Sequence, residues 1–144
     1  MRFWDSSAIV PLIVEEACSR ACRQLLRSDP VLVVWSLTRT EIISAIWRQH
    51  RGGLLSDATL ASADARITKL SARWAEVVAL DLVRIEAERL LRRHPLRAAD
   101  ALQLGAACIW AEGKQRGKLF VGLDKALLAA ARIEGFQTVI PNIK

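Results

Sequence analysis

The sequence contains few of the side chains that hold zinc, and it lacks long apolar runs. It has two histidines and three cysteines, the cysteines form no Cys-x-x-Cys pair, and tyrosine is absent. Without a cluster of cysteine and histidine we expect no zinc site. No apolar run approaches the roughly 18 residues of a membrane-spanning helix, so we expect no membrane contact. An acid inside the first apolar stretch is unlike a signal peptide, and we therefore expect a cytoplasmic protein.

Apolar residues, in contrast, make up 52% of the 144 positions. A chain of this length and composition can bury the core of one domain, and we expect a single domain over residues 1–144. Short apolar segments alternate along the chain with longer segments of helical periodicity. This alternation predicts an α/β fold with an open parallel sheet and helices on both faces.

Positive charge exceeds negative charge, with 21 lysines and arginines against 15 aspartates and glutamates, for a net charge of +6. Arginine makes up 16 of the 21 cations and can bind phosphate through a two-pronged fork. A net positive surface favours a nucleic-acid partner. The alternative is an arginine-rich surface that is merely solvated.

Two acids directly follow predicted strands. Asp5 comes after the first apolar segment, and Asp124 comes after a late one. In open α/β sheets ligands bind at the carboxyl ends of the strands, where the strand order reverses. An acid there can instead cap the next helix, and this is the alternative for Asp124. Capping explains Asp5 less well, because Ser6 and Ser7 could cap the next helix without it.

Two more acids lie on predicted helices. Asp100 is in a helix that is apolar nearly all round, so we expect it to be buried and to need a partner or a metal ion. Arg97, three residues earlier, is the alternative partner. Glu41 borders the apolar stripe of its helix and has Ala45, not a cation, four residues later. A solvated helix glutamate is the alternative for Glu41.

Together these four acids predict a metal site. If they converge, each close pair repels by about 4 kcal/mol at an effective dielectric constant of about 20. Such a cluster takes up protons or binds cations. Oxygen ligands without histidine or cysteine select hard ions, so we expect Mg²⁺, or else Mn²⁺. A bound water could then attack a phosphate.

Four segments resemble those of the PIN-domain ribonucleases, and within them the VapC-type toxins of prokaryotic toxin–antitoxin pairs. They resemble the family's opening strand with its Asp-Ser-Ser turn, its glutamate helix, its most distinctive helix, and its late strand with a fourth acid. In this sequence they are Phe3–Leu12, Thr38–Ala45, Leu96–Leu104 and Phe120–Leu127. Each motif is weak alone, but the four in this order cover almost the whole chain.

The resemblance implies a single PIN-like domain with a parallel sheet of order 3-2-1-4-5. It also implies a Mg²⁺- or Mn²⁺-dependent endoribonuclease that hydrolyses RNA phosphodiester bonds, is usually a homodimer, and is silenced by a cognate antitoxin. By motif match, Ser6 supports a carboxylate or a bound water. The catalytic and metal-binding residues are, by the same match, Asp5, Glu41, Asp100 and Asp124.

The sequence departs from the family pattern at two positions. Gly122 stands where the family often has serine or threonine, two residues before the fourth acid, so a hydroxyl hydrogen bond is lost and the role of Asp124 is less certain. Gln103 replaces a frequent histidine, and we expect this change to affect only packing.

Cations close to the four motifs are candidates to grip the RNA backbone, and an ordinary solvated charge is the alternative for each. They lie along the helix of Glu41, before Asp100 and beside Asp124. The candidates are Arg39, Arg48, Arg51, Arg92, Arg93, Arg97 and Lys125.

Two other functions remain open. One is a PIN-fold ribonuclease that works in RNA processing without an antitoxin. The other is a non-catalytic signalling or interaction module of the phospho-acceptor receiver type, which shares the sheet and the Mg²⁺-binding carboxylates. Receivers have a pair of acids after the first strand, whereas here a single Asp5 is followed by Ser6 and Ser7.

Overall fold

The computed structural model describes residues 1–142, so the last two residues of the expected domain lie outside the described part. Five strands alternate with seven helices in this part of the chain. The strands are β1 (Arg2–Trp4), β2 (Leu32–Trp35), β3 (Ala75–Val77), β4 (Leu119–Val121) and β5 (Gln137–Val139). The helices are α1 (Ser6–Ile13), α2 (Ser19–Ser28), α3 (Thr38–Arg51), α4 (Asp57–Ser71), α5 (Leu80–Arg93), α6 (Ala98–Ala111) and α7 (Lys125–Ile133).

All five strands form one parallel sheet in the order β3-β2-β1-β4-β5, which confirms the predicted α/β fold and strand order. Phe3 of β1 pairs with Val33 of β2 on one side and with Phe120 of β4 on the other. The strand order therefore reverses between β1 and β4. Their carboxyl ends mark the position where α/β folds bind ligands.

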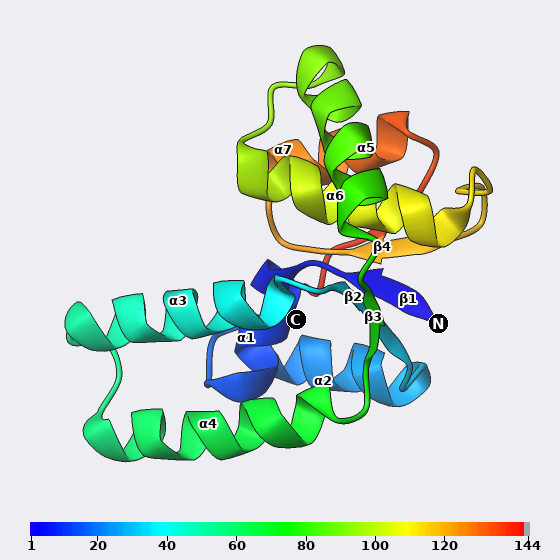
Figure 1. The fold of residues 1–144 in the computed structure, drawn as a ribbon. Coiled ribbons are helices and arrows are strands. Elements are labelled where there is room, and N and C mark those ends of the chain that lie inside the picture. The colour runs from blue at the N-terminus through cyan, green and yellow to red at the C-terminus, as the bar shows by residue number, and fades with distance from the viewer. Residues whose placement is uncertain (143–144) are drawn as a thin grey trace.

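Helices cover both faces of the sheet, as Figure 1 shows, with α1 to α4 on one side and α5 to α7 on the other. Because side chains alternate along a strand, Phe3 faces the core under α5 to α7, whereas Trp4 faces the core under α1 to α4. Both side chains are fully buried. The two cores hold the central strand from both sides and so fix the position of its carboxyl end. Within residues 1–142, no helix is long and apolar enough to cross a membrane.

The helices α5 and α6 pack at very close range, and a glycine makes this possible. A Cβ atom at Gly105 of α6 would lie 3.0 Å from the carbonyl oxygen of Val83 and 3.1 Å from the backbone nitrogen of Ala87, both on α5. Any larger residue would push the helices apart. The tight contact fixes α6, which carries Asp100.

Candidate active site

Two of the predicted acids flank the reversal of strand order. Asp5 directly follows β1, and its backbone N–H donates to the carbonyl of Val121 at 2.9 Å, which extends the pairing of β1 with β4 by one residue. Asp124 follows β4 by three residues and precedes α7. Glu41 enters from the first turn of α3, and Asp100 enters from the first turn of α6.

Asp5 is 4% exposed and is the N-cap of α1. Its carboxylate accepts hydrogen bonds from the backbone N–H of Ser7, at 3.2 Å, and from the Ser7 hydroxyl. The expectation that Ser6 or Ser7 would cap this helix is therefore wrong. Both serines belong to the first turn of α1, so the residue before them occupies the capping position.

Ser7 is a residue whose role the sequence did not predict. Its hydroxyl donates to Asp5 and also accepts from the backbone N–H of Leu123 at 3.0 Å. The side chain thus joins the turn after β1 to the loop after β4. In the sequence, a serine after an aspartate indicates only a helix start, and nothing marks this second contact.

Glu41 is half-buried on α3, and the hydroxyl of Ser6 donates to its Oε2 at 2.9 Å. This contact is of the kind that the sequence predicts for Ser6. The two hydroxyls of the Ser6–Ser7 pair therefore hold two different acids, Asp5 from α1 and Glu41 from α3.

Asp100 and Asp124 occupy helix starts at the same edge of the sheet. Asp124 is exposed and caps α7, accepting from the backbone N–H of Leu127 at 2.8 Å, so the capping role that the sequence left open is present. Asp100 is partly buried, and the positive charge of Arg97, the N-cap of α6, acts on it.

The four acids, which we call the acid cluster (Asp5, Glu41, Asp100 and Asp124), are linked by their mutual repulsion. The pKa of Asp5 is raised to about 6, chiefly by burial. The Ser7 hydrogen bonds oppose this rise, and the charges of Glu41 and Asp100 add to it. Burial also raises the pKa of Glu41, and the charge of Asp100 adds to this effect. Burial and the charge of Asp124 together raise the pKa of Asp100. Asp5, Glu41 and Asp100 are therefore each affected by the charge of at least one other acid of the cluster.

The acid cluster fits a hard divalent cation by its chemistry, since it offers only carboxylate oxygens that repel one another. Among residues 1–142, no three His, Cys, Asp or Glu side chains lie in an arrangement that could hold one ion. Mg²⁺ is commonly bound by one or two carboxylates and completed by water, so it does not require three. The predicted acids therefore influence one another electrostatically, but within residues 1–142 they do not form a three-carboxylate metal site.

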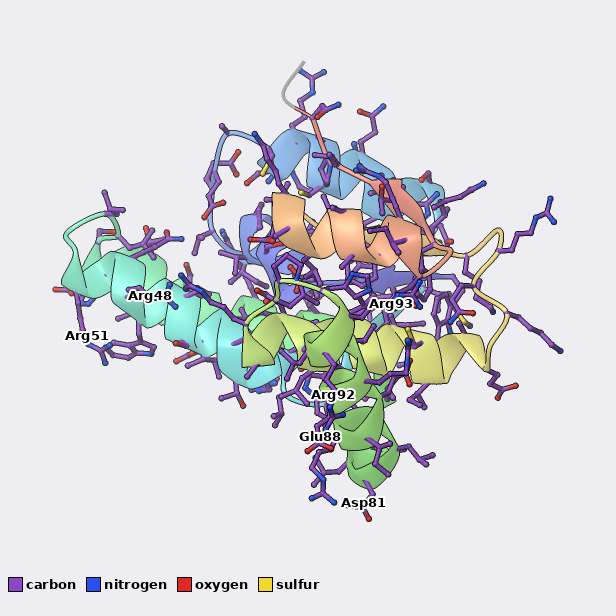
Figure 2. The ribbon with its side chains drawn as sticks, turned by 90° about the horizontal axis from the view of Figure 1, so that it is seen from above. Arg48, Arg51, Asp81, Glu88, Arg92 and Arg93 are labelled. Carbon is purple, nitrogen blue, oxygen red and sulfur yellow. The ribbon has the colours of Figure 1, made fainter. Side chains whose placement is uncertain are left out.

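The candidate RNA-binding cations do not form a single group. Arg39, in the first turn of α3, donates to the Ser71 hydroxyl at 2.7 Å. Arg97 and Lys125 stand beside acids at the starts of α6 and α7. The other four lie farther along α3 and at the end of α5, as Figure 2 shows: Arg48, Arg51, Arg92 and Arg93.

The model of the PIN domain family matches residues 2–133, and the chain therefore belongs to the PIN domain family. Members of this family are generally metal-dependent nucleases. Among solved structures, the chain is similar to that titled "Crystal Structure of PAE2754 from Pyrobaculum aerophilum", with 24% identity and a TM-score of 0.62. The match covers 96% of this chain and 88% of that one, and it shows the shared fold. Nothing among the curated proteins matches.

The strand order excludes the receiver-type module that the sequence left open. Receiver-like flavodoxin folds have the order 2-1-3-4-5. The observed order is 3-2-1-4-5.

Proposed function

We propose that the chain is a Mg²⁺- or Mn²⁺-dependent endoribonuclease that hydrolyses RNA phosphodiester bonds and acts as the toxin of a toxin–antitoxin pair. The observation that carries the nuclease proposal is the acid cluster at the carboxyl ends of β1 and β4. Burying a carboxylate costs stability, and Asp5 is only 4% exposed. A bound cation would offset this cost, so the buried charge points to a functional site.

One or two carboxylates among Asp5, Glu41 and Asp100 would ligate the ion directly, and the other acids, with Asp124 at the exposed side of the cluster, would act through bound water. A bound divalent cation supplies activation of an attacking water and stabilisation of charge at the phosphate. The chain contributes orientation: Ser7 holds the Asp5 carboxylate and Ser6 holds that of Glu41. Both acids are thus positioned before any ligand arrives, which reduces the cost of binding.

The charge distribution supports an RNA substrate. Four of the 15 acids belong to the acid cluster, which leaves 11 acids against 21 cations over the rest of the chain. Arg97 acts on Asp100, and Lys125 directly follows Asp124 at the start of α7, so these two cations would contact the phosphates on either side of the cleaved bond. Cations that contact only phosphates can bind single-stranded RNA of any base sequence.

A groove between α1, α2 and α4 supports the proposed antitoxin. Its floor is apolar, from Leu12, Ile13, Leu26 and Leu70, and its rim is basic. The rim residues are Arg23, Arg66, Lys69 and Arg73. An amphipathic segment with an acidic face matches both features. A ribonuclease that works in RNA processing needs no antitoxin. A small antitoxin gene beside this one would therefore favour the toxin function.

The outward side of α5 supports the proposed homodimer. Leu82 and Ile85 lie about one turn apart on one side of this helix, and both are exposed, as apolar side chains at a protein interface are in the free subunit. Five of the large apolar side chains exposed on the surface lie within fourteen consecutive residues of this region: Val78, Leu80, Leu82, Ile85 and Leu91.

The charges on α5 are complementary to those on a second copy of the same helix, which favours self-association over another partner. Asp81, Ile85, Glu88 and Arg92 recur at intervals of three and four residues and so share one side of the helix. The three charged residues among them, Asp81, Glu88 and Arg92, follow one another along α5 in Figure 2. In an antiparallel pair of α5 helices about a two-fold axis, Asp81 faces Arg92 of the partner subunit, and the reverse pair forms too. Two copies of a chain with net positive charge repel each other. The paired opposite charges along α5 would offset this repulsion where the two copies meet.

The experiment that tests the nuclease function is cleavage of a labelled single-stranded RNA in Mn²⁺. We expect wild-type protein to cleave, and we expect EDTA or Asp5→Asn to reduce the rate by at least about 100-fold. Cleavage that persists in EDTA would remove the metal-dependent mechanism.

A further inference from the structure

Gln103 is a fully buried polar residue that the proposed function does not yet use. It lies on α6, one turn after Asp100, and is 0% exposed. Glutamine is rarely buried completely, because its amide needs hydrogen bonds that an apolar core does not supply. Leucine or methionine would fill a similar volume without this cost.

The Gln103 amide connects α6 to α3. Its Nε2 donates to Oγ1 of Thr38 at 3.1 Å, across 65 residues of sequence. Thr38 is also fully buried and lies one turn before Glu41 on α3. Burial raises the pKa of the Glu41 carboxyl, and the same amide acts on it in the opposite direction. The helices that carry Glu41 and Asp100 are therefore joined by one side chain.

Only the nitrogen of the Gln103 side-chain amide has a hydrogen-bond partner among the described residues. The Oε1 of Gln103 is buried and has no hydrogen-bond partner within residues 1–142. An unpaired buried carbonyl destabilises the folded state, so a residue selected only to fill space would not be a glutamine. The amide N–H groups, one of which donates to Thr38, explain why a glutamine occupies this position. The expectation that replacing the family's frequent histidine affects only packing is therefore incomplete.

We propose that Gln103 is a positioning residue of the acid cluster, whose amide N–H groups hold the Glu41 carboxylate toward the ion, with Thr38 fixing the orientation of the amide. This inference rests on the proposed metal-dependent function. Residues that orient a metal ligand in this way typically contribute 10- to 100-fold to metal affinity.

The test is Mn²⁺ binding, measured by calorimetry and by the rise in melting temperature. We expect Gln103→Leu to weaken Mn²⁺ binding by about 10- to 100-fold. Leu104→Val is the matched control, since it opens a small cavity at the next, fully buried position of α6 and should leave Mn²⁺ affinity unchanged. Gln103→His restores a ring N–H donor and should bind within about threefold of wild type. Equal affinity of Gln103→Leu and wild type would overturn the proposal.

A second measurement separates this proposal from the proposed function. In the metal-free protein, the side-chain amide proton signals of Gln103 should move in Glu41→Gln and stay in place in the surface variant Glu112→Gln. If wild type binds no Mn²⁺, the proposed function fails, and the amide signals still report whether Gln103 holds Glu41. Signals that do not respond to Glu41→Gln would overturn the contact itself.

Discussion

At the scale of single residues, Asp5 combines two tasks with opposite effects on stability. As the N-cap of α1 it accepts two hydrogen bonds from Ser7, which favour the folded state. As a buried member of the acid cluster it is costly to ionise, and its pKa rises from 3.8 to about 6. The cap alone does not need the charge, because asparagine caps helices equally well.

We therefore expect Asp5→Asn to lose activity and gain stability. Between pH 3.8 and about 6 the folded state binds more protons at Asp5 than the unfolded state does, so the stability of wild type falls as pH rises through this window. Above it the penalty amounts to about 3 kcal/mol. In EDTA, Asp5→Asn should be about 1–3 kcal/mol more stable than wild type at pH 8 and about equal to it at pH 4. Urea unfolding at both pH values measures this, and a variant less stable at pH 8 would contradict the account.

Gly122 allows a hydroxyl group to be added, because the PIN family often has serine or threonine at this position. A Cβ atom at this position would meet the Cβ of Asp5 and a methyl of Leu128 at 3.5 Å each, which is ordinary contact. Gly122→Ser should therefore fold and place a hydroxyl beside Asp5. We expect about three- to tenfold tighter Mn²⁺ binding. Gly122→Ala adds the same Cβ without the hydroxyl and should bind as wild type does, so equal gains in both variants would refute the role of the hydroxyl.

The sequence indicated the acids of the candidate site but not two of the polar residues, Ser7 and Gln103, that lie among them. Asp5 and Asp124 could be found because acids directly after strands face the ligand edge of a parallel sheet. Ser7 and Gln103 could not be found, because a serine after an aspartate indicates a cap and a glutamine in an apolar helix indicates packing. Their contacts, to Leu123 and Thr38, join segments that are distant in sequence and meet only in the folded chain.

At the scale of elements, the order of the strands could not be derived from local patterns. Four of the five strands have three residues, which is too short to show an alternation of polar and apolar side chains. The order 3-2-1-4-5 was implied by the resemblance to the PIN family and is confirmed by the pairing. Helix starts were likewise uncertain, because several polar residues compete for the capping position, as Asp5, Ser6 and Ser7 do.

The helix α5 carries the prediction about self-association. Ile85→Asp should convert the proposed homodimer to a monomer in sedimentation analysis, because it places a further charge in the middle of the proposed contact. Ile133→Asp is the matched control, since Ile133 is 62% exposed and Ile85 is 61% exposed. Asp81→Arg and Arg92→Asp should each weaken the dimer, and the double exchange should restore it. A dimer that tolerates Ile85→Asp would show that α5 is not the interface.

At the scale of the whole molecule, the net charge of +6 is divided between an acid cluster and a more basic remainder. A protein that holds RNA by its backbone must lose affinity as salt rises, because bound counterions are released. With about five phosphate contacts, affinity should fall about 100-fold between 50 and 200 mM salt. Arg97→Gln should reduce this dependence, whereas Arg27→Gln, exposed on α2, should not. An affinity that is independent of salt would refute the backbone contacts.

If the acid cluster makes this PIN domain a metal-dependent ribonuclease, RNA cleavage must depend on its carboxylates. The most direct measurement compares the rate of RNA cleavage in Mn²⁺ by wild type, Asp100→Asn and Asp64→Asn, because Asp64 is an exposed acid on α4 outside the acid cluster. We predict that Asp100→Asn cleaves at least about 100-fold more slowly and that Asp64→Asn cleaves at the wild-type rate. Equal rates in all three proteins would contradict the account.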